Sequence, residues 1–564
     1  MNSGRFISIL FLCIALCTTF AGAIQDDMPS IESKLESIRS WMHNDFEVPN
    51  SVESPGTVIG VVLRHHGSVL GQGTGSTLQQ ASGDALKELR RQKIFQRELP
   101  ALLRQEILDS ISIELEICDT FVPSPHKNID HFEHSFVYGD NGIAVRLRGK
   151  TSYRLPCILR LAPHRNIANI TESLCIDVGV HPTIALSHNL PMNADITLYT
   201  LPCKTYFQNK AHGNCVSLLH GDEPIGTTLL VPSTLLELSD ALASHLIVSS
   251  GSGSVIGGYQ PETDTFTSIF ATHFVQLLTA NALYSYAQVE GAQCSTKAKE
   301  TASAILESIA SDVRKSNAFD IESASLLLVL LNQTGIEKND AVQELETNSK
   351  QLVLQTVLHS TQAELTEMSP FILALLCAAT FELETTSENP SYELSSSLCA
   401  LSCSATTPAN RASLIPWVIH PMLAFEKLKP GSFAKPLLEL LALAKVSQVT
   451  ATGLHEGGFL LQTNDGMVVD ARGLRMIPML AKLCHWNAGN PSTSFQALSR
   501  SIGFVEQLST RKERANRFSN PAMALGGIRK SSWDAAMPTE ATAMALIGVV
   551  EALRTIENIE STIK

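Results

Sequence analysis

The feature that most constrains the fold of this 564-residue chain is a threefold repeat in its C-terminal half. Each copy begins with a Gly-Gly pair and an apolar or aromatic residue, and the first glycines are Gly257, Gly457 and Gly526. Glycine pairs let a chain pass close under a neighbouring helix because they carry no Cβ. Apolar segments of helical character lie between the copies. The pattern predicts helix hairpins joined by glycine-rich loops over residues 236–564.

An aspartate follows each glycine pair at nearly constant spacing. Asp264 lies seven residues after the first glycine of its copy, whereas Asp465 and Asp534 lie eight residues after theirs. In the first and third copies a threonine, Thr272 or Thr542, stands eight residues beyond the aspartate. Asp and Thr are typical N-cap residues, so the simplest interpretation is that they cap the helices that follow.

If these loops meet at one end of the helical domain, their polar residues could instead line a pocket. The candidate ligand-binding residues are Tyr259, His273, His455, Arg472 and Trp533. A catalytic alternative uses two carboxylates as acid and base on a glycosidic bond. Its candidates are Asp264, Asp465, Asp470, Asp534 and Glu540. A third possibility is a metal-dependent enzyme that uses His273 and His455.

Helix hairpins repeated through Gly-Gly loops resemble the α/α toroid, and an α-solenoid is the alternative fold. The toroid is shared by terpene cyclases, protein prenyltransferases, thioester-containing complement domains and several polysaccharide-degrading families. The resemblance implies a fold and not a reaction. The chain contains neither a D-x-D-D string nor a Cys-Gly-Glu-Gln string, and Cys484 and His485 are adjacent, which does not suit joint ligation of one metal from a helix face. We therefore predict no metal site and leave the cofactor unknown.

The N-terminal half mixes strand and helix patterns, and residues 58–212 predict an α+β domain. The glycine-rich stretch between an apolar strand and a helix raises the question of a phosphate cradle. A dinucleotide fingerprint needs a third glycine where Ser76 stands, and a Gly-Lys-Ser/Thr loop is also absent. We interpret Gly71, Gly73 and Gly75 as a tight turn into a helix that packs on a sheet.

The order of segments in this half resembles the AMME chromosomal region protein family, a small α+β domain. The matching segments are "VVLRHHGSVLGQG", "LEICDTFVPSP", "VYGDNGIAVRLRGKTSYRLP", "ITESLCIDVGV" and "ITLYTLPCKTYF". The chain departs from the family at its Arg-Gly-Cys motif, where Leu70, Gly71 and Gln72 stand. Asn141-Gly142 replaces the family's His-Gly turn. The resemblance therefore implies the fold, without an activity that depends on the family's thiol.

The net charge of the chain bears on its possible partners, and its first residues bear on the cellular compartment. A formal net charge of −13 without a strongly basic stretch argues against nucleic acid as a partner. Residues 1–23 combine Arg5, an apolar run and Ala21-Gly22-Ala23, which is typical of a secretory signal peptide. An uncleaved membrane anchor is the alternative, but the apolar run is short for a bilayer span. We expect an exported protein, periplasmic or extracellular, with no membrane span after cleavage. In such a compartment Cys203 and Cys215, which flank a polar loop, could form a disulfide.

These observations divide the chain into a signal peptide (1–23), a helical linker (24–57), the AMME-like domain (58–212), a second linker (213–235) and the toroid (236–564). We predict a binding or scaffold protein whose toroid pocket holds a small molecule, a glycan or a protein of the cell envelope. The alternative is a toroid-type carbohydrate-active hydrolase or lyase.

Overall fold

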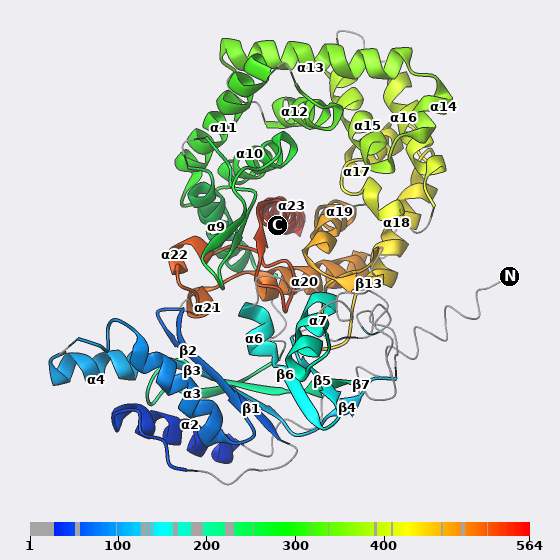
Figure 1. Cartoon of the computed structure of the whole chain (residues 1–564). Coiled ribbons are helices and arrows are strands. Elements are labelled where there is room, and N and C mark those ends of the chain that lie inside the picture. Colours follow the sequence, from blue (N-terminus) through cyan, green and yellow to red (C-terminus); the bar gives the residue numbers. More distant parts are fainter. Residues whose placement is uncertain are drawn as a thin grey trace.

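The structure is a computed structural model that describes residues 28–50, 57–97, 99–125, 132, 136, 139–161, 167–181, 196–219, 230–251, 253–316, 318–334, 336, 338–387, 392–407, 410–463, 466–484, 486, 491–515 and 517–563. An N-terminal part with two antiparallel sheets lies against a larger ring of helices (Figure 1). This agrees in outline with the predicted α+β part followed by a helical part. None of the described helices is long and apolar enough to cross a membrane.

The first sheet of the N-terminal part has the order β2-β1-β3-β8-β9. Its strands are β1 (Val58–His65), β2 (Ser68–Gly75), β3 (Ser112–Cys118), β8 (Lys204–Gln208) and β9 (Cys215–Leu218). Three helices accompany it, namely α2 (Met28–His43), α3 (Leu78–Arg91) and α4 (Ala101–Ser110). The apolar face of α2 belongs to the same core as this sheet, although α2 comes from the predicted linker 24–57. Likewise, β9 comes from the predicted linker 213–235.

A second sheet has the order β4-β7-β5-β6. Its strands are β4 (Val122–Pro123), β5 (Asn141–Leu147), β6 (Lys150–Arg154) and β7 (Ile196–Pro202). The helices α6 (Pro156–Leu161) and α7 (Ile167–Val178) contact strands of this sheet. A disulfide joins Cys118 at the end of β3 to Cys203. The predicted pairing of Cys203 with Cys215 is therefore wrong, because β3 lies next to β8 and brings Cys118 beside Cys203, whereas Cys215 is a buried free thiol.

The glycine-rich stretch is part of strand β2 and not a turn, which corrects the sequence interpretation. Residues 71, 73 and 75 alternate along the strand and face helix α3, whose N-cap is Thr77. A Cβ on Gly71 would lie 2.1 Å from Ala85 O, and one on Gly73 would lie 2.1 Å from Ala81 O. These glycines therefore let the strand and the helix approach closely, and their backbone does not cradle a phosphate.

The helices of the C-terminal part alternate between an inner and an outer layer of the ring (Figure 1). The inner helices are α10 (His273–Ala287), α12 (Ile321–Thr334), α15 (Pro370–Thr385), α17 (Ile419–Leu428), α19 (Met476–Leu483) and α23 (Thr539–Ile563). The outer helices are α9 (Pro232–Ser249), α11 (Ser295–Ser316), α13 (Asp340–His359), α16 (Glu393–Ala405), α18 (Ala434–Ser447) and α20 (Pro491–Leu508). Helix α10 packs against both α12 and α23, so the first and last inner helices are neighbours.

Short strands lie in the glycine-rich loops, which the prediction of an all-helical part did not include. They are β10 (Gly258–Gln260), β11 (Thr265–Ser268), β12 (Leu460–Thr463), β13 (Gly466–Val469) and β14 (Met537–Pro538). In two loops the first glycine passes directly against an outer helix. A Cβ on Gly457 would lie 1.8 Å from Arg500 O of α20, and one on Gly526 would lie 2.1 Å from Ala241 O of α9. The close passage predicted for the Gly-Gly pairs is confirmed at these two positions.

Candidate functional sites

The three glycine-rich loops lie side by side at the end of the ring where α10, α19 and α23 begin. Strand β10 of the first loop pairs with β14 of the third, with Tyr259 opposite Met537. The second loop joins them because Ala471 N donates to Lys530 O at 2.9 Å. The loops thus meet, as the pocket hypothesis requires, but most of their polar side chains bind one another.

In the first loop, the predicted site residues stabilise the hairpin and the start of α10. Asp264 lies in the β10–β11 turn at a φ of 50° and accepts the hydroxyl of Tyr259 at 2.7 Å. Burial and this carboxylate raise the pKa of Tyr259. Thr272 caps α10 as predicted, and the ring of His273 lies 5.8 Å from that of Phe319.

In the second and third loops, two aspartates bind backbone amides close to them in sequence. Asp470 caps a short helix by accepting from Arg472 N, and it forms an ion pair with the guanidinium of Arg472 at 2.6 Å. Asp534 accepts from Ala536 N at 3.0 Å. Asp470 is thus a helix cap, whereas Asp534 binds within its own loop and does not cap α23, which begins at Thr539, so the predicted capping role of Asp534 is wrong.

The two histidines of the metal hypothesis make separate contacts. His455 Nε2 lies 2.8 Å from Ser532 Oγ, and His273 begins α10. Within the described residues, no three His, Cys, Asp or Glu side chains are grouped in a way that could hold a metal ion. Asp465 and His485 lie outside the described residues.

Trp533 and Glu540 complete the set of sequence candidates. Trp533 lines a small cavity together with Pro156 and Leu159 of α6 and Ile170 of α7, so it contacts the N-terminal part. Glu540 is exposed in the first turn of α23. A cavity lies on the axis of the ring of helices, and none of the described site residues predicted from the sequence lines it.

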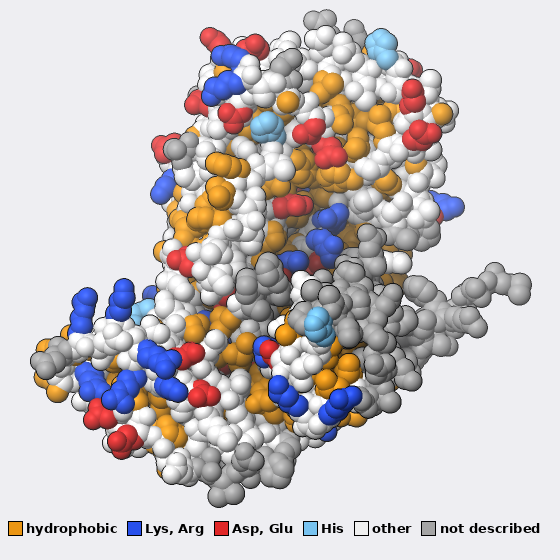
Figure 2. Space-filling view, viewed as in Figure 1, with side chains coloured by type: hydrophobic (Ala, Val, Ile, Leu, Met, Phe, Trp, Pro, Cys, Tyr) orange, Lys and Arg blue, Asp and Glu red, His pale blue; other side chains and the backbone are white. Residues whose placement is uncertain are grey.

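The axial cavity has a volume of about 100 Å³ and is lined by side chains from the inner helices. Its polar lining residues are Asn281, Ser285, Gln288, Glu382, His420, Lys482, Glu551 and Arg554. Several of them lie near the carboxyl ends of α10, α15 and α19, so the cavity lies at the opposite end of these helices from the glycine-rich loops. Figure 2 shows this face of the ring hollowed at its centre, with apolar, acidic and basic side chains in the hollow.

The charged groups of the axial cavity balance one another. Glu551 forms an ion pair with Arg554 at 2.9 Å and lies 3.7 Å from Lys482 Nζ. Glu382 Oε1 lies 4.0 Å from His420 Nε2. The surrounding cavity wall and the Lys482 ammonium lower the pKa of His420 to about 4, so this imidazole is neutral at pH 7. Two cations therefore face two carboxylates, and the apolar residues Trp417, Ile419, Met479 and Ile547 complete the wall.

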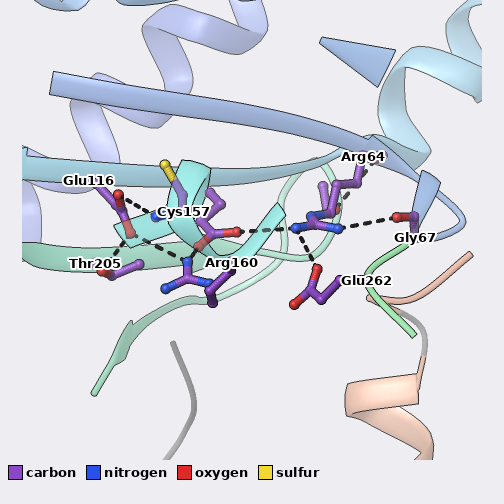
Figure 3. A network of polar contacts seen from close by, with 9 residues as sticks. Arg64, Gly67, Glu116, Cys157, Arg160, Thr205 and Glu262 are labelled. Atoms are coloured by element: carbon purple, nitrogen blue, oxygen red, sulfur yellow. Dashed lines mark hydrogen bonds and ion pairs between the residues drawn. The ribbon is translucent and has the colours of Figure 1, made fainter. Parts of the chain in front are cut away.

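A second group of polar residues connects the N-terminal sheet with the first glycine-rich loop (Figure 3). Arg64 of β1 pairs with Glu262 at 3.0 Å and lies 4.0 Å from Glu114 of β3. Arg160 of α6 contacts Glu114 and Glu116. These side chains are all buried or nearly so, and together they join the two parts of the molecule.

Glu116 is the fully buried carboxylate at the end of this network. It accepts hydrogen bonds from Cys157 N at 2.9 Å and from Thr205 Oγ1 at 3.3 Å. Burial raises the pKa of Glu116 to about 7, although these hydrogen bonds act in the opposite direction. The neighbouring Cys157 thiol is also buried, and its pKa is raised well above the usual range. A neutral buried thiol is a poor nucleophile, so Cys157 is not a candidate for nucleophilic catalysis.

Next to this network, a cavity of about 50 Å³ lies between the two parts of the molecule. We call it the interface cavity. The charged residues that line it are Arg64, Glu114, Arg160, Glu262, Arg514, Arg517 and Arg529. The N-terminal part adds Phe207 and Leu218, and the ring adds Thr510 and Trp533.

Sequence reasoning missed both cavities for a common reason. Their residues come from elements far apart in the chain and share no motif, so spacing along the sequence does not reveal them. One signal was present: Lys482 is the single charged residue of the apolar helix α19. Among the predicted candidates, Trp533 lines the interface cavity.

No family model and no curated protein matches this chain. An uncharacterized protein from Pyrococcus horikoshii is 14% identical, with a TM-score of 0.23, and the match covers 33% of this chain and 92% of that one. A possible member of the GH105 family from Klebsiella pneumoniae subsp. pneumoniae MGH 78578 is 12% identical, with a TM-score of 0.39. That match covers 59% of this chain and 96% of the other. Both TM-scores are below 0.5, and at these values neither similarity supports an inference about this chain.

Proposed function

We propose that this chain is an exported binding protein that holds a neutral glycan segment in the axial cavity of an α/α toroid. The observation that carries the proposal is the axial cavity itself, which the inner helices line with equal numbers of cations and carboxylates. Export rests on the sequence of residues 1–23. The contact between α10 and α23 supports a closed toroid over an open solenoid. The hairpin β1–β2 followed by α3 is compatible with an AMME-like N-terminal domain.

The lining of the axial cavity favours a neutral, hydroxyl-rich ligand. Glu382 and Glu551 can accept hydrogen bonds, Lys482 and Arg554 can donate them, and the amide of Asn281 can do both. Because the two signs cancel, the cavity has no net charge that would select an anion or a cation. The polar groups also argue against a lipid chain, which could not pair them. Sugars offer both hydroxyl groups and apolar ring faces, and the wall contains the indole of Trp417.

Binding to an array of neutral oligosaccharides, followed by calorimetric titration, tests this function. We expect the protein to bind at least one glycan, and Lys482→Met to weaken that binding about tenfold or more, because it removes a charged hydrogen-bond donor. Arg554 still pairs with Glu551 in this variant, so the fold should be retained. Lys299→Met, at an exposed position of α11, is the matched control. Absence of glycan binding, or equal binding by Lys482→Met, would refute the proposal.

A glycoside-cleaving enzyme is the second candidate, because Glu382 of α15 and Glu551 of α23 line the same cavity. Two carboxylates across a glycosidic bond are the usual requirement for its hydrolysis. The assay is incubation of the bound glycan with the protein, followed by chromatography of the products. Cleavage that disappears in Glu382→Gln while glycan binding persists would favour the enzyme. An intact glycan after prolonged incubation would favour the binding protein.

A further inference from the structure

The interface cavity concentrates guanidinium groups from both parts of the molecule. Arg64 and Arg160 come from the N-terminal part, and Arg514, Arg517 and Arg529 come from the ring. Arg64, Arg160, Arg514 and Arg529 are each no more than 8% exposed. Among the described lining residues, the carboxylates are Glu114 and Glu262. Glu262 pairs with Arg64, and Glu114 contacts both Arg64 and Arg160, so these carboxylates already pair with the guanidinium groups of the N-terminal part.

Backbone carbonyl groups and the side chain of Phe207 hold the guanidinium groups that come from the ring of helices. Arg529 donates to Leu508 O at 3.3 Å and to Ser532 O at 3.1 Å, and Arg514 donates to Gln507 O at 2.8 Å. The guanidinium of Arg517 lies 4.2 Å from the centre of the Phe207 ring in β8. Their side chains are thus held in place before any ligand arrives, which reduces the entropy lost on binding.

Thr510 supplies an independent sign of a ligand at this cavity. Its side chain is 1% exposed and lines the cavity, and among the described residues Thr510 Oγ1 has no hydrogen-bond partner. Its backbone is fixed by the third Gly-Gly pair, since Thr510 N donates to Gly527 O at 3.0 Å and Gly526 N donates to Thr510 O at 2.8 Å. A buried hydroxyl without a partner is unfavourable, so a ligand oxygen that accepts a hydrogen bond from it would stabilise it.

We propose that the interface cavity binds a tetrahedral oxyanion, a phosphate or a sulfate, between the two parts of the molecule. Arginine forks match the oxygens of such anions, and Thr510 Oγ1 adds a neutral donor. A single water needs about 10–15 Å³ of this kind of space. The volume of about 50 Å³ therefore has room for one small oxyanion and not for a large organic ligand. The anion is either free or the terminal group of a larger molecule that reaches in from solvent.

Calorimetric titration and thermal unfolding of the full chain test this proposal, with sulfate and inorganic phosphate as probes and chloride at matched ionic strength as the reference. We expect saturable binding of at least one oxyanion and a corresponding rise in Tm. Thr510→Val should weaken binding about fivefold without disturbing a side-chain hydrogen bond. Arg517→Gln should weaken it about tenfold or more. Arg314→Gln, on an exposed ion pair of α11, is the control and should bind as the wild type does.

No saturable binding of either probe, or binding that is unchanged in both Thr510→Val and Arg517→Gln, would overturn the proposal. If Arg517→Gln fails to fold, the isosteric Thr510→Val still decides the matter. Native mass spectrometry of the protein as purified then identifies the source of the anion. A retained mass equal to phosphate or sulfate indicates a free oxyanion, whereas a larger phosphorylated or sulfated mass indicates the end group of a longer ligand.

Discussion

Glu116 links the stability of the N-terminal part to pH. Burial raises its pKa from 4.5 to about 7, so between these values the folded chain keeps a proton that the unfolded chain has lost. The free energy of unfolding therefore falls as pH rises through this window, by roughly 3 kcal/mol in total. Glu116→Gln removes the titrating group, and we expect this slope to disappear. Urea unfolding at pH 5, 6, 7 and 8 measures it.

The amide of Glu116→Gln also replaces one acceptor oxygen by a donor, which weakens the contacts to Thr205 and Arg160 at every pH. The quantity to compare is therefore the change of the free energy of unfolding with pH, and not its value at one pH. Glu106→Gln, at an exposed position of α4, is the control and should keep the pH slope of the wild type. If Glu116→Gln and the wild type lose the same free energy between pH 5 and pH 8, Glu116 does not titrate in this window.

At the level of elements, the close packing of β2 on α3 depends on the alternate glycines of the strand. A Cβ on Gly73 would lie 2.1 Å from Ala81 O and 2.7 Å from Ala85 N, both of which belong to helix backbone. Gly73→Ala should therefore push the helix away and destabilise the N-terminal part by about 3 kcal/mol. Thermal unfolding monitored by circular dichroism measures the loss.

Gly83 provides the matched control for that substitution, because it lies within α3 and a Cβ there would meet nothing within 4 Å. Alanine favours a helix by about 1 kcal/mol over glycine, so Gly83→Ala should stabilise the protein. Equal effects of the two substitutions would mean that glycine composition, and not the contact between strand and helix, determines the stability here.

The same elements show which parts of the fold could be predicted from sequence patterns and which could not. The mixed strand and helix patterns of residues 58–212 predicted an α+β part, and the apolar segments of the C-terminal half predicted the helices of the ring. Glycines spaced by two residues were interpreted as a turn, although this spacing puts them on one face of a strand. The pairing of Cys118 with Cys203 depends on β3 lying beside β8, and the shared cavity of Glu382 and Glu551 depends on how the ring is arranged. Such long-range neighbours leave no mark on local spacing.

At the level of the whole molecule, the N-terminal part contacts the ring through the turn between β1 and β2. Gly67 has a φ of 77° in this turn, and a Cβ on it would lie 1.8 Å from the backbone carbon of Phe518. Gly67→Ala should thus separate the two parts near Phe518. We expect hydrogen exchange of residues 510–525 to become faster, because the backbone there loses its cover.

Gly149→Ala isolates the contact from the backbone strain. Gly149 has a φ of 84° in the turn between β5 and β6, and a Cβ there would meet nothing within 4 Å. Both substitutions place alanine in the left-handed region, which costs about 1 kcal/mol or more. Faster exchange at residues 510–525 in Gly67→Ala alone would establish this turn as the contact that joins the parts. Unchanged exchange in both variants would mean that the network of Arg64 and Glu262 holds the parts together without it.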